Sequence, residues 1–465
     1  DRHSFLGKFA VKGLKSGNII SLNTGNLVQE PKFSPNGNLV AFVVDNNLFY
    51  QDLNSGKITQ ITFDGKKNAI INGIGDWVYE EEFGHADFYQ WSKGSDAIIF
   101  VKSDETKVPE INIPIYGKNL YPKLMTYKYP KAGEENSAVS AHLYQLGSGK
   151  TLNLNLSSFE NYYIPQVFAT AKNDEVALAT SNRHQNKVDI LKVNTTNGAV
   201  SKLLTETDNA WIETDNLTLE FLEDNSFLWA SERDGNRHLY WYDANGKLKK
   251  QVTKGNWEIT EYYGFNPNSK EVFLQTTEKG SINKVVSKFN IVTGKSQLLS
   301  QAEGNNSAAF SNNYNYFIET SSSAKKPYAY TLKDGNGKAL KELQNNDALL
   351  NKLNADNFVV KEFINIPNEA GDLMNAYIMK PKNFDPNKKY PLFMFQYSGP
   401  GSQQVSNSWD GGNGLWFNHL VQKGYVVACV DGRGTGYKGT KYKKVTYKNL
   451  GKYEIEDQIA AAKWL

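Results

Sequence analysis

The chain has 465 residues and a formal net charge of +3; 40% of its residues are hydrophobic and 22% are charged. This length favours two domains over one, and the composition is typical of a globular protein. The small net charge and the lack of a basic tract argue against a nucleic-acid partner or an anionic membrane surface, and no apolar run is long enough to span a membrane. Aromatic residues make up 13% of the chain, which favours a β-rich fold.

Residues 1–345 contain short alternating strand patterns separated by turn residues. A unit of strand, turn, strand, turn and strand recurs, and its copies begin near Phe33, Tyr89, Ala171, Leu219, Phe265 and Phe310. The last three copies are about 45 residues apart, which is the length of a four-stranded propeller blade. A series of β-sandwiches is the alternative, but the repeated Asn-Gly and Asp-Gly turns favour a propeller. About six and a half blades can be counted, and residues 5–22 are interpreted as the end of an earlier blade.

An insert between Lys107 and Ala138 interrupts one blade and is predicted to be a surface loop. A helix over residues 346–357 then marks a change of domain. Strands and helices alternate in residues 346–465, and the inner strands are apolar throughout, which is typical of an α/β domain. The pattern ends in a predicted helix from Glu454 to Leu465, with Ile455, Ile459 and Ala462 on one face.

The sequence shows no motif with the spacing of a metal or cofactor site. The single cysteine, Cys429, lies in an apolar strand pattern, so we expect a buried, inert thiol and no intrachain disulfide. Neither a Walker loop nor a dinucleotide fingerprint is present. We therefore expect neither a metal nor a cofactor. The histidines share no metal-ligand spacing, and they are His3, His85, His142, His184, His238 and His419.

An acidic stretch, Asp76–Glu82, ends in three consecutive glutamates. In a strand these side chains would diverge, whereas in a helical turn Glu81 and Glu82 project about 100° apart and can converge on one small cation. No Lys or Arg between Lys67 and Lys93 neutralises them. The alternative is a solvated acidic turn.

Trp77–Glu82 resembles the double-glutamate motif of the dipeptidyl peptidase IV family. Further segments resemble that family in the same order along the chain: Arg2–Ser4, Tyr129–Glu134, Tyr397–Pro400, Asp431–Tyr437 and Tyr453–Gln458. The resemblance implies an eight-bladed β-propeller, here residues 1–345 without its N-terminal part, followed by the first part of an α/β-hydrolase domain in residues 346–465. Because animal members have disulfides in the propeller, the chain resembles the bacterial members, as a fragment that lacks both ends.

The resemblance implies a serine peptidase that releases amino-terminal dipeptides with Pro or Ala in the second position. Glu81 and Glu82 are then expected to bind the α-ammonium group of the substrate, and Arg2 the carbonyl of its first residue. The hydroxyl of Tyr397 is expected to complete the oxyanion hole. Glu80 and Arg433 are expected to be structural.

No G-x-S-x-G nucleophile motif is present in these residues. In the resembled family this motif follows the helix that matches Tyr453–Gln458, and the triad Asp and His come later. The nucleophile Ser and both partners are therefore expected outside this chain, and the 465 residues alone are expected to be inactive.

The resemblance also implies peptide partners with a free amino terminus, a homodimer, and a periplasmic, cell-surface or extracellular location. Two other functions stay open. One is a prolyl tripeptidyl peptidase, whose amine anchor would lie elsewhere; the other is a catalytically inactive member that serves as a binding scaffold.

Overall fold

The computed structural model describes residues 3–4, 6–22, 25–215 and 217–465. The chain forms two compact units, Asp1–Phe227 with Asp243–Lys247, and Leu228–Tyr242 with Leu248–Leu465. The second unit contains sheets of the repeating type as well as the whole α/β region. The predicted domain boundary between residues 345 and 346 therefore lies inside the second unit. It separates two types of fold, and it stays a prediction.

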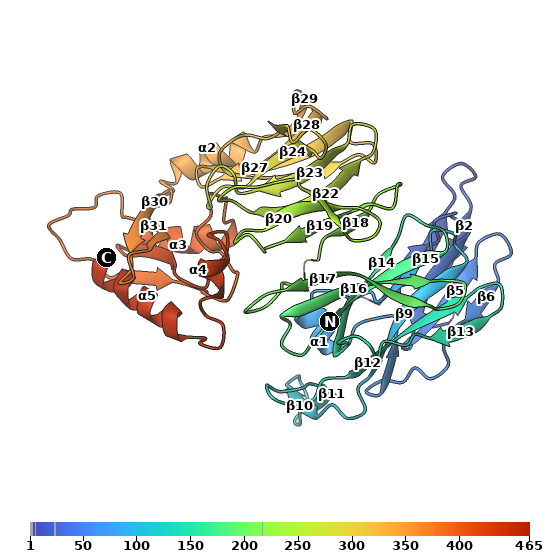
Figure 1. The fold of residues 1–465 in the computed structure, drawn as a ribbon. Helices are drawn as coiled ribbons and strands as arrows, with labels where there is room; N and C mark the ends of the chain where they lie inside the picture. The colour runs from blue at the N-terminus through green and yellow to red at the C-terminus, as the bar shows by residue number, and fades with distance from the viewer. Residues whose placement is uncertain (1–2, 5, 23–24, 216) are drawn as a thin grey trace. The chain divides into compact units, whose positions relative to one another are not determined.

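Antiparallel sheets of four or five strands recur along the described residues (Figure 1). Most connect consecutive strands, in the orders β3-β4-β5-β6, β14-β15-β16-β17, β18-β19-β20-β21, β22-β23-β24-β25 and β26-β27-β28-β29. Another has the order β13-β12-β9-β7 with β8 also paired to β9, and β1 and β2 form a two-stranded sheet. Repeated four-stranded antiparallel sheets are the pattern of propeller blades, so the predicted mainly-β fold is confirmed.

The strands up to residue 221 are β1 (Ala10–Lys12), β2 (Ile19–Ser21), β3 (Gln29–Phe33), β4 (Leu39–Val44), β5 (Asn47–Asp52), β6 (Ile58–Gln60), β7 (Ile70–Asn72), β8 (Tyr89–Trp91), β9 (Ala97–Asp104), β10 (Glu110–Ile115), β11 (Lys123–Lys128), β12 (Ala138–Gln145), β13 (Lys150–Asn153), β14 (Tyr163–Ala169), β15 (Glu175–Ser181), β16 (Lys187–Asn194), β17 (Val200–Thr207) and β18 (Leu219–Phe221). Inner strands such as β4 and β15 are apolar on both faces and almost entirely buried, because both faces of their sheets are covered.

The remaining propeller-type strands are β19 (Phe227–Ser231), β20 (His238–Tyr242), β21 (Leu248–Gln251), β22 (Ile259–Asn266), β23 (Glu271–Thr276), β24 (Val285–Asn290), β25 (Ser296–Leu298), β26 (Asn305–Phe310), β27 (Tyr316–Ser323), β28 (Lys326–Asp334) and β29 (Ala339–Gln344). The recurring sequence unit contained three strands, and the structure adds one strand before it. Phe265 and Phe310, for example, lie near the end of the first strands β22 and β26.

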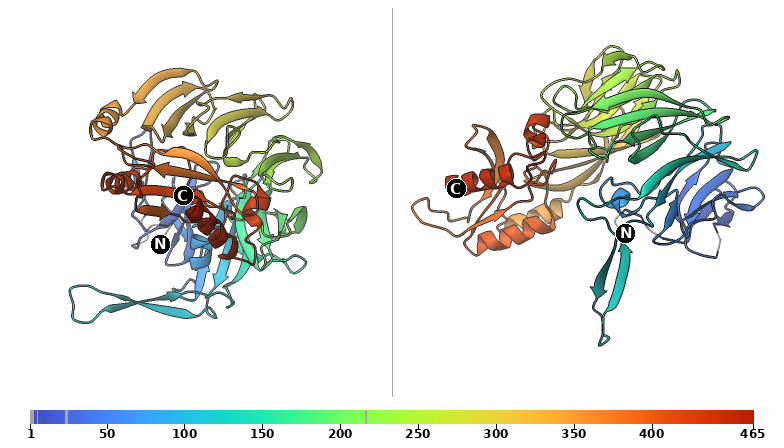
Figure 2. Two further views of the ribbon diagram at one scale, coloured as in Figure 1. Left: turned by 90° about the vertical axis from the view of Figure 1, so that its left-hand side faces the viewer. Right: turned by 60° about the horizontal axis from the view of Figure 1, so that its bottom comes forward.

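The insert between Lys107 and Ala138 was predicted to be a surface loop, and the structure shows that it forms an antiparallel hairpin. Strands β10 and β11 pair from Glu110 opposite Lys128 to Ile115 opposite Lys123. Figure 2 shows this hairpin as a ribbon that extends away from the sheets of its own unit. It exposes large apolar side chains, namely Ile113, Ile115, Tyr116, Leu120, Tyr121, Leu124 and Met125.

The α/β region contains one sheet in the order β30-β31-β33-β32. Strands β32 and β33 are parallel and the other pairs are antiparallel. The predicted alternation of strands and helices is confirmed for this region, and helices are present where they were predicted at residues 346–357 and 454–465. The elements are α2 (Asp347–Ala355), β30 (Glu362–Pro367), β31 (Leu373–Met379), β32 (Leu392–Phe395), α3 (Gly412–Gln422), β33 (Val426–Asp431), α4 (Thr440–Lys444) and α5 (Lys452–Trp464).

Each face of this sheet has its own core. Cys429 packs with Tyr377, Phe417 and Val421 on one face. Cys429 is buried, as predicted, and burial raises the pKa of its thiol, which agrees with the expected low reactivity. On the other face Ala461 of α5 packs against Val430 and its neighbours.

The apolar face predicted for α5 does not face this core. Ile455 is 60% exposed and Ile459 is 50% exposed, whereas Asp457 and Ala461 are buried. The helix is turned this way because the Asp457 carboxylate binds Arg433 inside the domain. Among the described residues, none of the helices is long and apolar enough to cross a membrane.

Candidate active site

The three glutamates lie on a short helix, α1 (Trp77–Glu81), with Glu82 as its C-cap. Asp76 is the N-cap, and its side chain accepts a hydrogen bond from the amide of Tyr79 at 3.0 Å. Such a cap satisfies an amide that a helix start leaves unpaired. The predicted helical turn is therefore confirmed, and Glu80, Glu81 and Glu82 are consecutive on it.

Buried contacts fix the base of α1. The Ser137 hydroxyl donates to Asp76, and the Tyr79 hydroxyl accepts a hydrogen bond from the amide of Ile164 at 3.0 Å. The rings of Trp77 and Tyr129 lie 4.4 Å apart between centroids. Burial raises the pKa of Asp76, although the hydrogen bonds from Ser137 and the Tyr79 amide act against this. The helix is thus held by its own unit through several independent contacts.

The glutamates differ in burial along α1. Glu80 is 7% exposed, Glu81 is half-buried and Glu82 is exposed. The carboxylate of Glu80 accepts hydrogen bonds from the His3 amide at 2.7 Å, the Ser4 amide at 2.9 Å and the Ser4 hydroxyl at 2.8 Å. Glu80 therefore binds the protein itself, as predicted for a structural residue.

Tyr397 follows β32 in the second unit and is 68% exposed. The next residue, Ser398, is buried and has φ 58°, a left-handed conformation that non-glycine residues adopt uncommonly. The Nε2 of Gln458 lies 3.4 Å from the Ser398 hydroxyl and donates to the Val430 carbonyl at 2.9 Å. The chain thus turns sharply at Ser398, and the phenol of Tyr397 is directed out of the apolar core.

A glycine-rich loop supports the Tyr397 segment. The Gly401 amide donates to the Gly434 carbonyl at 2.9 Å, and the Gly436 amide donates to the Ser402 carbonyl at 2.9 Å. A Cβ on Gly436 would lie 2.5 Å from the Gly401 carbonyl oxygen, so only glycine allows this approach. The loop 431–437 therefore sets the position of the backbone that follows Tyr397.

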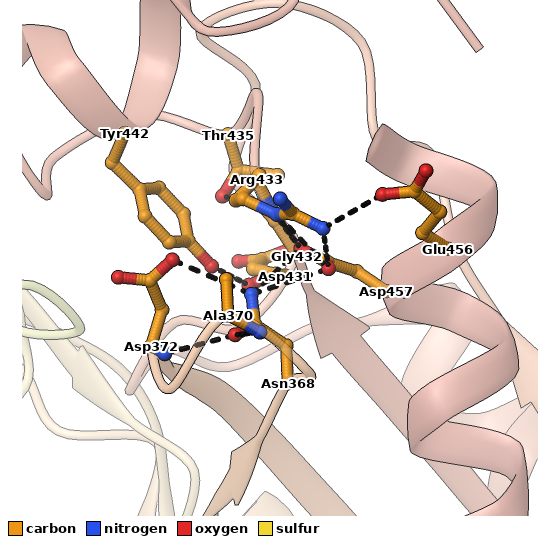
Figure 3. Close-up of polar contacts among 10 residues, drawn as sticks. All are labelled: Asn368, Ala370, Asp372, Asp431, Gly432, Arg433, Thr435, Tyr442, Glu456 and Asp457. Carbon is orange, nitrogen blue, oxygen red and sulfur yellow. Dashed lines mark hydrogen bonds and ion pairs between the residues drawn. The ribbon is translucent and has the colours of Figure 1, made fainter. Parts of the chain in front are cut away.

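Arg433 anchors this loop to α5 (Figure 3). Its main-chain amide donates to Asp457 at 2.6 Å and its guanidinium to Asp457 at 2.7 Å, while the contact to Glu456 is 3.2 Å long. The side-chain amide of Asn368 also donates to Asp457, at 3.2 Å. The expectation that Arg433 holds the loop agrees with these contacts.

Asp431 ties a second backbone segment to the end of β33. Its carboxylate accepts hydrogen bonds from the amides of Gln404 at 3.1 Å and Val405 at 2.8 Å. Burial raises the pKa of Asp431 to about 6, although the hydrogen bonds from these two amides favour the ionised form and lower the pKa. No group of three or more His, Cys, Asp or Glu residues within the described ranges has the geometry of a metal site.

Two family models match the chain. The model described as "Dipeptidyl peptidase IV (DPP IV) N-terminal region" matches residues 1–328, and the model described as "Prolyl oligopeptidase family" matches residues 415–465. The chain belongs to the dipeptidyl peptidase IV family. The suspected resemblance is thereby confirmed.

Individual relatives agree with this family. Dipeptidyl peptidase 4 of Trichophyton rubrum is 31% identical over 487 residues, which cover 99% of this chain and 62% of the relative. The crystal structure of Porphyromonas gingivalis dipeptidyl peptidase 4 has a TM-score of 0.95 and 40% identity, over 100% of this chain and 66% of that one. A putative dipeptidyl aminopeptidase IV from Bacteroides ovatus has a TM-score of 0.84 and 25% identity, over 100% of this chain and 68% of that one. The chain thus spans about three fifths of the curated relative.

The predicted site residues have different outcomes. Glu81 and Glu82 lie together on α1, and Tyr397 is an exposed residue of the second unit. Arg2 lies outside the described residues. The substrate contacts of all four stay predictions.

Sequence reasoning missed the groups that hold these residues in place. Asp76, Asp431 and Asp457 are buried carboxylates, and each accepts main-chain hydrogen bonds. A possible signal was that Asp76 precedes a helix start and Asp431 ends an apolar strand. Asp457 carried no such signal, because its partner Arg433 is 24 residues away.

Proposed function

We propose that the protein to which this chain belongs is a serine exopeptidase that releases X-Pro or X-Ala dipeptides from the amino terminus of peptides. Its relatives carry the names of dipeptidyl peptidases, which supports a peptidase acting on peptide amino termini. The observation that carries the proposal is α1, a helix with a buried base that presents Glu81 and Glu82 at its end.

The glutamate pair is suited to an ammonium ligand. An ammonium group has three donors, and charge-assisted hydrogen bonds to carboxylates are shorter and stronger than neutral ones. The base of α1 is fixed by Asp76 and Tyr79, so Glu81 and Glu82 are held on a preorganised support. An amine bound at a fixed distance from the nucleophile would select the second peptide bond of the substrate.

The remaining roles are part of the same proposal. The Tyr397 hydroxyl donates to the oxyanion that forms during peptide-bond attack, and Arg2 binds the carbonyl of the first substrate residue. The exposed phenol at a sharp turn supports this role for Tyr397. The chain spans 62% of the length of the Trichophyton rubrum relative, and we propose that the nucleophile Ser and its Asp and His partners belong to the part of the full-length protein that this chain does not span.

The test compares Glu81→Gln and Glu82→Gln in the full-length protein. Each change keeps the shape of the side chain and removes a charge, so kcat/KM for an Ala-Pro-anilide should fall by the equivalent of about 2–5 kcal/mol. The amino-acetylated substrate should be poor with the wild type and change little further. Glu303→Gln, at an exposed glutamate, controls for the loss of one negative charge. Normal cleavage of Ala-Pro-anilide by Glu82→Gln would remove the amine-binding role.

The same assay separates the alternative functions. Preferential release of tripeptides would identify a prolyl tripeptidyl peptidase. Peptide binding by the full-length protein without turnover would identify an inactive scaffold.

We also propose a homodimer that acts in the periplasm, on the cell surface or outside the cell. The exposed apolar side chains of the β10–β11 hairpin, such as Tyr116, Leu120 and Tyr121, support a contact with another protein surface. Sedimentation of the full-length protein and fractionation of the source cells test the two statements separately.

A further inference from the structure

The chain runs from the β10–β11 hairpin back to β12 through residues 129–137, which we call the return segment. Its last residue, Ser137, is buried, and the Ser137 hydroxyl donates to the carboxylate of Asp76, the N-cap of α1. At the other end of the segment, the ring of Tyr129 packs edge-on against Trp77, the first residue of α1, with 4.4 Å between the centroids. The return segment thus contacts the start of α1 at two points.

The same segment also reaches the opposite end of α1, through one aromatic ring. The side-chain amide of Asn136 donates to the hydroxyl of Tyr163 at 2.6 Å. The ring of Tyr163 lies 5.2 Å from that of Phe83 between centroids, and Phe83 directly follows Glu82 in the sequence. Both rings belong to the buried core of the unit. Asn136 and Ser137 therefore act on the two ends of α1 from adjacent positions in the chain.

The return segment is itself held by a neighbouring sheet. The guanidinium of Arg183, in the turn between β15 and β16, donates to the Glu134 carbonyl at 3.0 Å and to the Tyr162 hydroxyl at 2.8 Å. The same guanidinium lies over the Tyr162 ring, 5.0 Å from its centroid. The segment is therefore anchored on two sides, to α1 and to the sheet that contains β15 and β16.

These contacts matter because α1 belongs to an excursion of the chain between β7 and β8. The excursion is closed at its neck, where the amide of Gly75 donates to the Ala86 carbonyl at 3.0 Å. A bond at the neck does not set the angle between the excursion and the rest of the unit. That angle depends on the buried rings of Tyr79 and Phe83, on the hydrogen bond from the Ile164 amide to the Tyr79 hydroxyl, and on the return segment.

We propose that the return segment is a positioning element for the amine site, with Ser137 and Asn136 as its positioning residues. They fix the start and the end of α1, and so determine where the carboxylates of Glu81 and Glu82 lie for the substrate ammonium. The insert then takes part in substrate recognition, in addition to the partner contact proposed for its exposed tip. This inference rests on the proposed function of Glu81 and Glu82.

The test measures Ser137→Ala, Asn136→Ala and the double variant in the full-length protein. The readout is the ratio of kcat/KM for Ala-Pro-anilide to kcat/KM for propionyl-Pro-anilide, which lacks only the amine. Both substrates contain the carbonyl assigned to Arg2, so the ratio reports the amine contact alone. Each single change removes one hydrogen bond and should lower the ratio by about 3- to 10-fold. The double change should lower it by about 10- to 100-fold, mainly through KM, because a small misplacement of binding groups has effects of this size.

Ser140→Ala is the matched control. Ser140 lies in β12, and its hydroxyl contacts the His142 ring at 2.8 Å rather than α1, so the ratio should stay at the wild-type value. A merely structural return segment would lower the melting temperature and reduce turnover of both substrates alike, and that result overturns the inference. An unchanged ratio in a folded double variant overturns it as well. Where the double variant does not fold, an unchanged ratio in both single variants has the same consequence.

Glu82→Gln separates this inference from the proposed function. If Glu82→Gln cleaves Ala-Pro-anilide normally, the amine site itself is wrong. If Glu82→Gln is impaired and the double variant keeps the wild-type ratio, the amine site stands and only the role of the return segment is wrong.

Discussion

Asp457 accepts hydrogen bonds from both the main-chain amide and the guanidinium of Arg433, at 2.6 and 2.7 Å. The side chain of Asp457 is 1% exposed and that of Arg433 is 12% exposed, so the pair is shielded from water. Asn368 occupies a further acceptor site of the same carboxylate. This pair joins α5 to the loop that supports the segment after Tyr397.

Asp457→Ala should destabilise the chain by about 3 kcal/mol, because it removes the buried partner of Arg433 and leaves only the contact to the half-exposed Glu456. Urea unfolding of the 465-residue chain, followed by tryptophan fluorescence, measures the shift of the midpoint. Glu456→Ala is the matched control: it removes the other carboxylate on Arg433, but Glu456 is 46% exposed and should contribute less than about 1 kcal/mol. Equal shifts for the two variants would contradict the structural role of Asp457.

Glu105 is a buried carboxyl beside the base of α1. It is 6% exposed, and burial together with the negative charge of Asp76 raises its pKa to about 7, against the opposing effects of Lys128 and the Asn68 amide. In the unfolded chain its pKa is expected near the ordinary value of 4.5. Between these two values the folded chain binds a proton that the unfolded chain has released.

Stability should therefore fall as the pH rises from about 4.5 to about 7 and then stay level, as far as Glu105 is concerned. Glu105→Gln removes this term, so it should raise the stability at pH 8 relative to the wild type, by on the order of 2 kcal/mol. Melting temperatures of both proteins are measured across this pH range and subtracted from each other. The contributions of titratable groups that both proteins share cancel in this difference curve. Glu135→Gln, at an exposed glutamate, should give a flat difference curve. A flat curve for Glu105→Gln would mean that its carboxyl is not perturbed.

Local patterns predicted most of the fold. Alternating and continuous apolar runs identified strands such as β4 and β33, and Asp76 before Trp77 is compatible with the start of α1. The β10–β11 hairpin was not predicted, because many of its apolar side chains remain exposed and so no pattern of burial marks its strands.

Long-range polar contacts could not be predicted in the same way. Ile455 and Ile459 marked an apolar face of α5, but the buried bond of Asp457 to Arg433 determines which face is inside. Likewise, nothing local to Glu80 indicates that it binds His3 and Ser4, since the contact depends on the folded path of the chain. Residue types at the site were recognisable, whereas their supports were not.

The 465-residue chain alone should not hydrolyse Gly-Pro-anilide, because it contains no G-x-S-x-G nucleophile motif. The measurement is release of the anilide after repeated purification, with full-length protein as the positive control. Turnover that persists through purification and is blocked by a serine-directed phosphonate would show that the nucleophile lies within these residues.

The hydroxyl of Tyr397 is expected to complete the oxyanion hole, and the alternative is a purely structural tyrosine at the end of an apolar strand. The ring is 68% exposed, so it contributes little to the core of the α/β region. The backbone after it is held by Gly434, Gly436 and Gln458 through main-chain and amide contacts that do not involve the phenol. Loss of the hydroxyl should therefore leave the fold intact.

Tyr397→Phe in the full-length protein should lower kcat by about a hundredfold, equivalent to roughly 3 kcal/mol, because one donor to the oxyanion is lost in the transition state. The KM should stay within about a few-fold, since ground-state binding does not use this donor. The melting temperature of the same variant should equal that of the wild type. Tyr425→Phe, at a tyrosine of the second unit that is 37% exposed, should leave both quantities unchanged. A kcat for Tyr397→Phe within about threefold of the wild type would remove Tyr397 from the oxyanion hole.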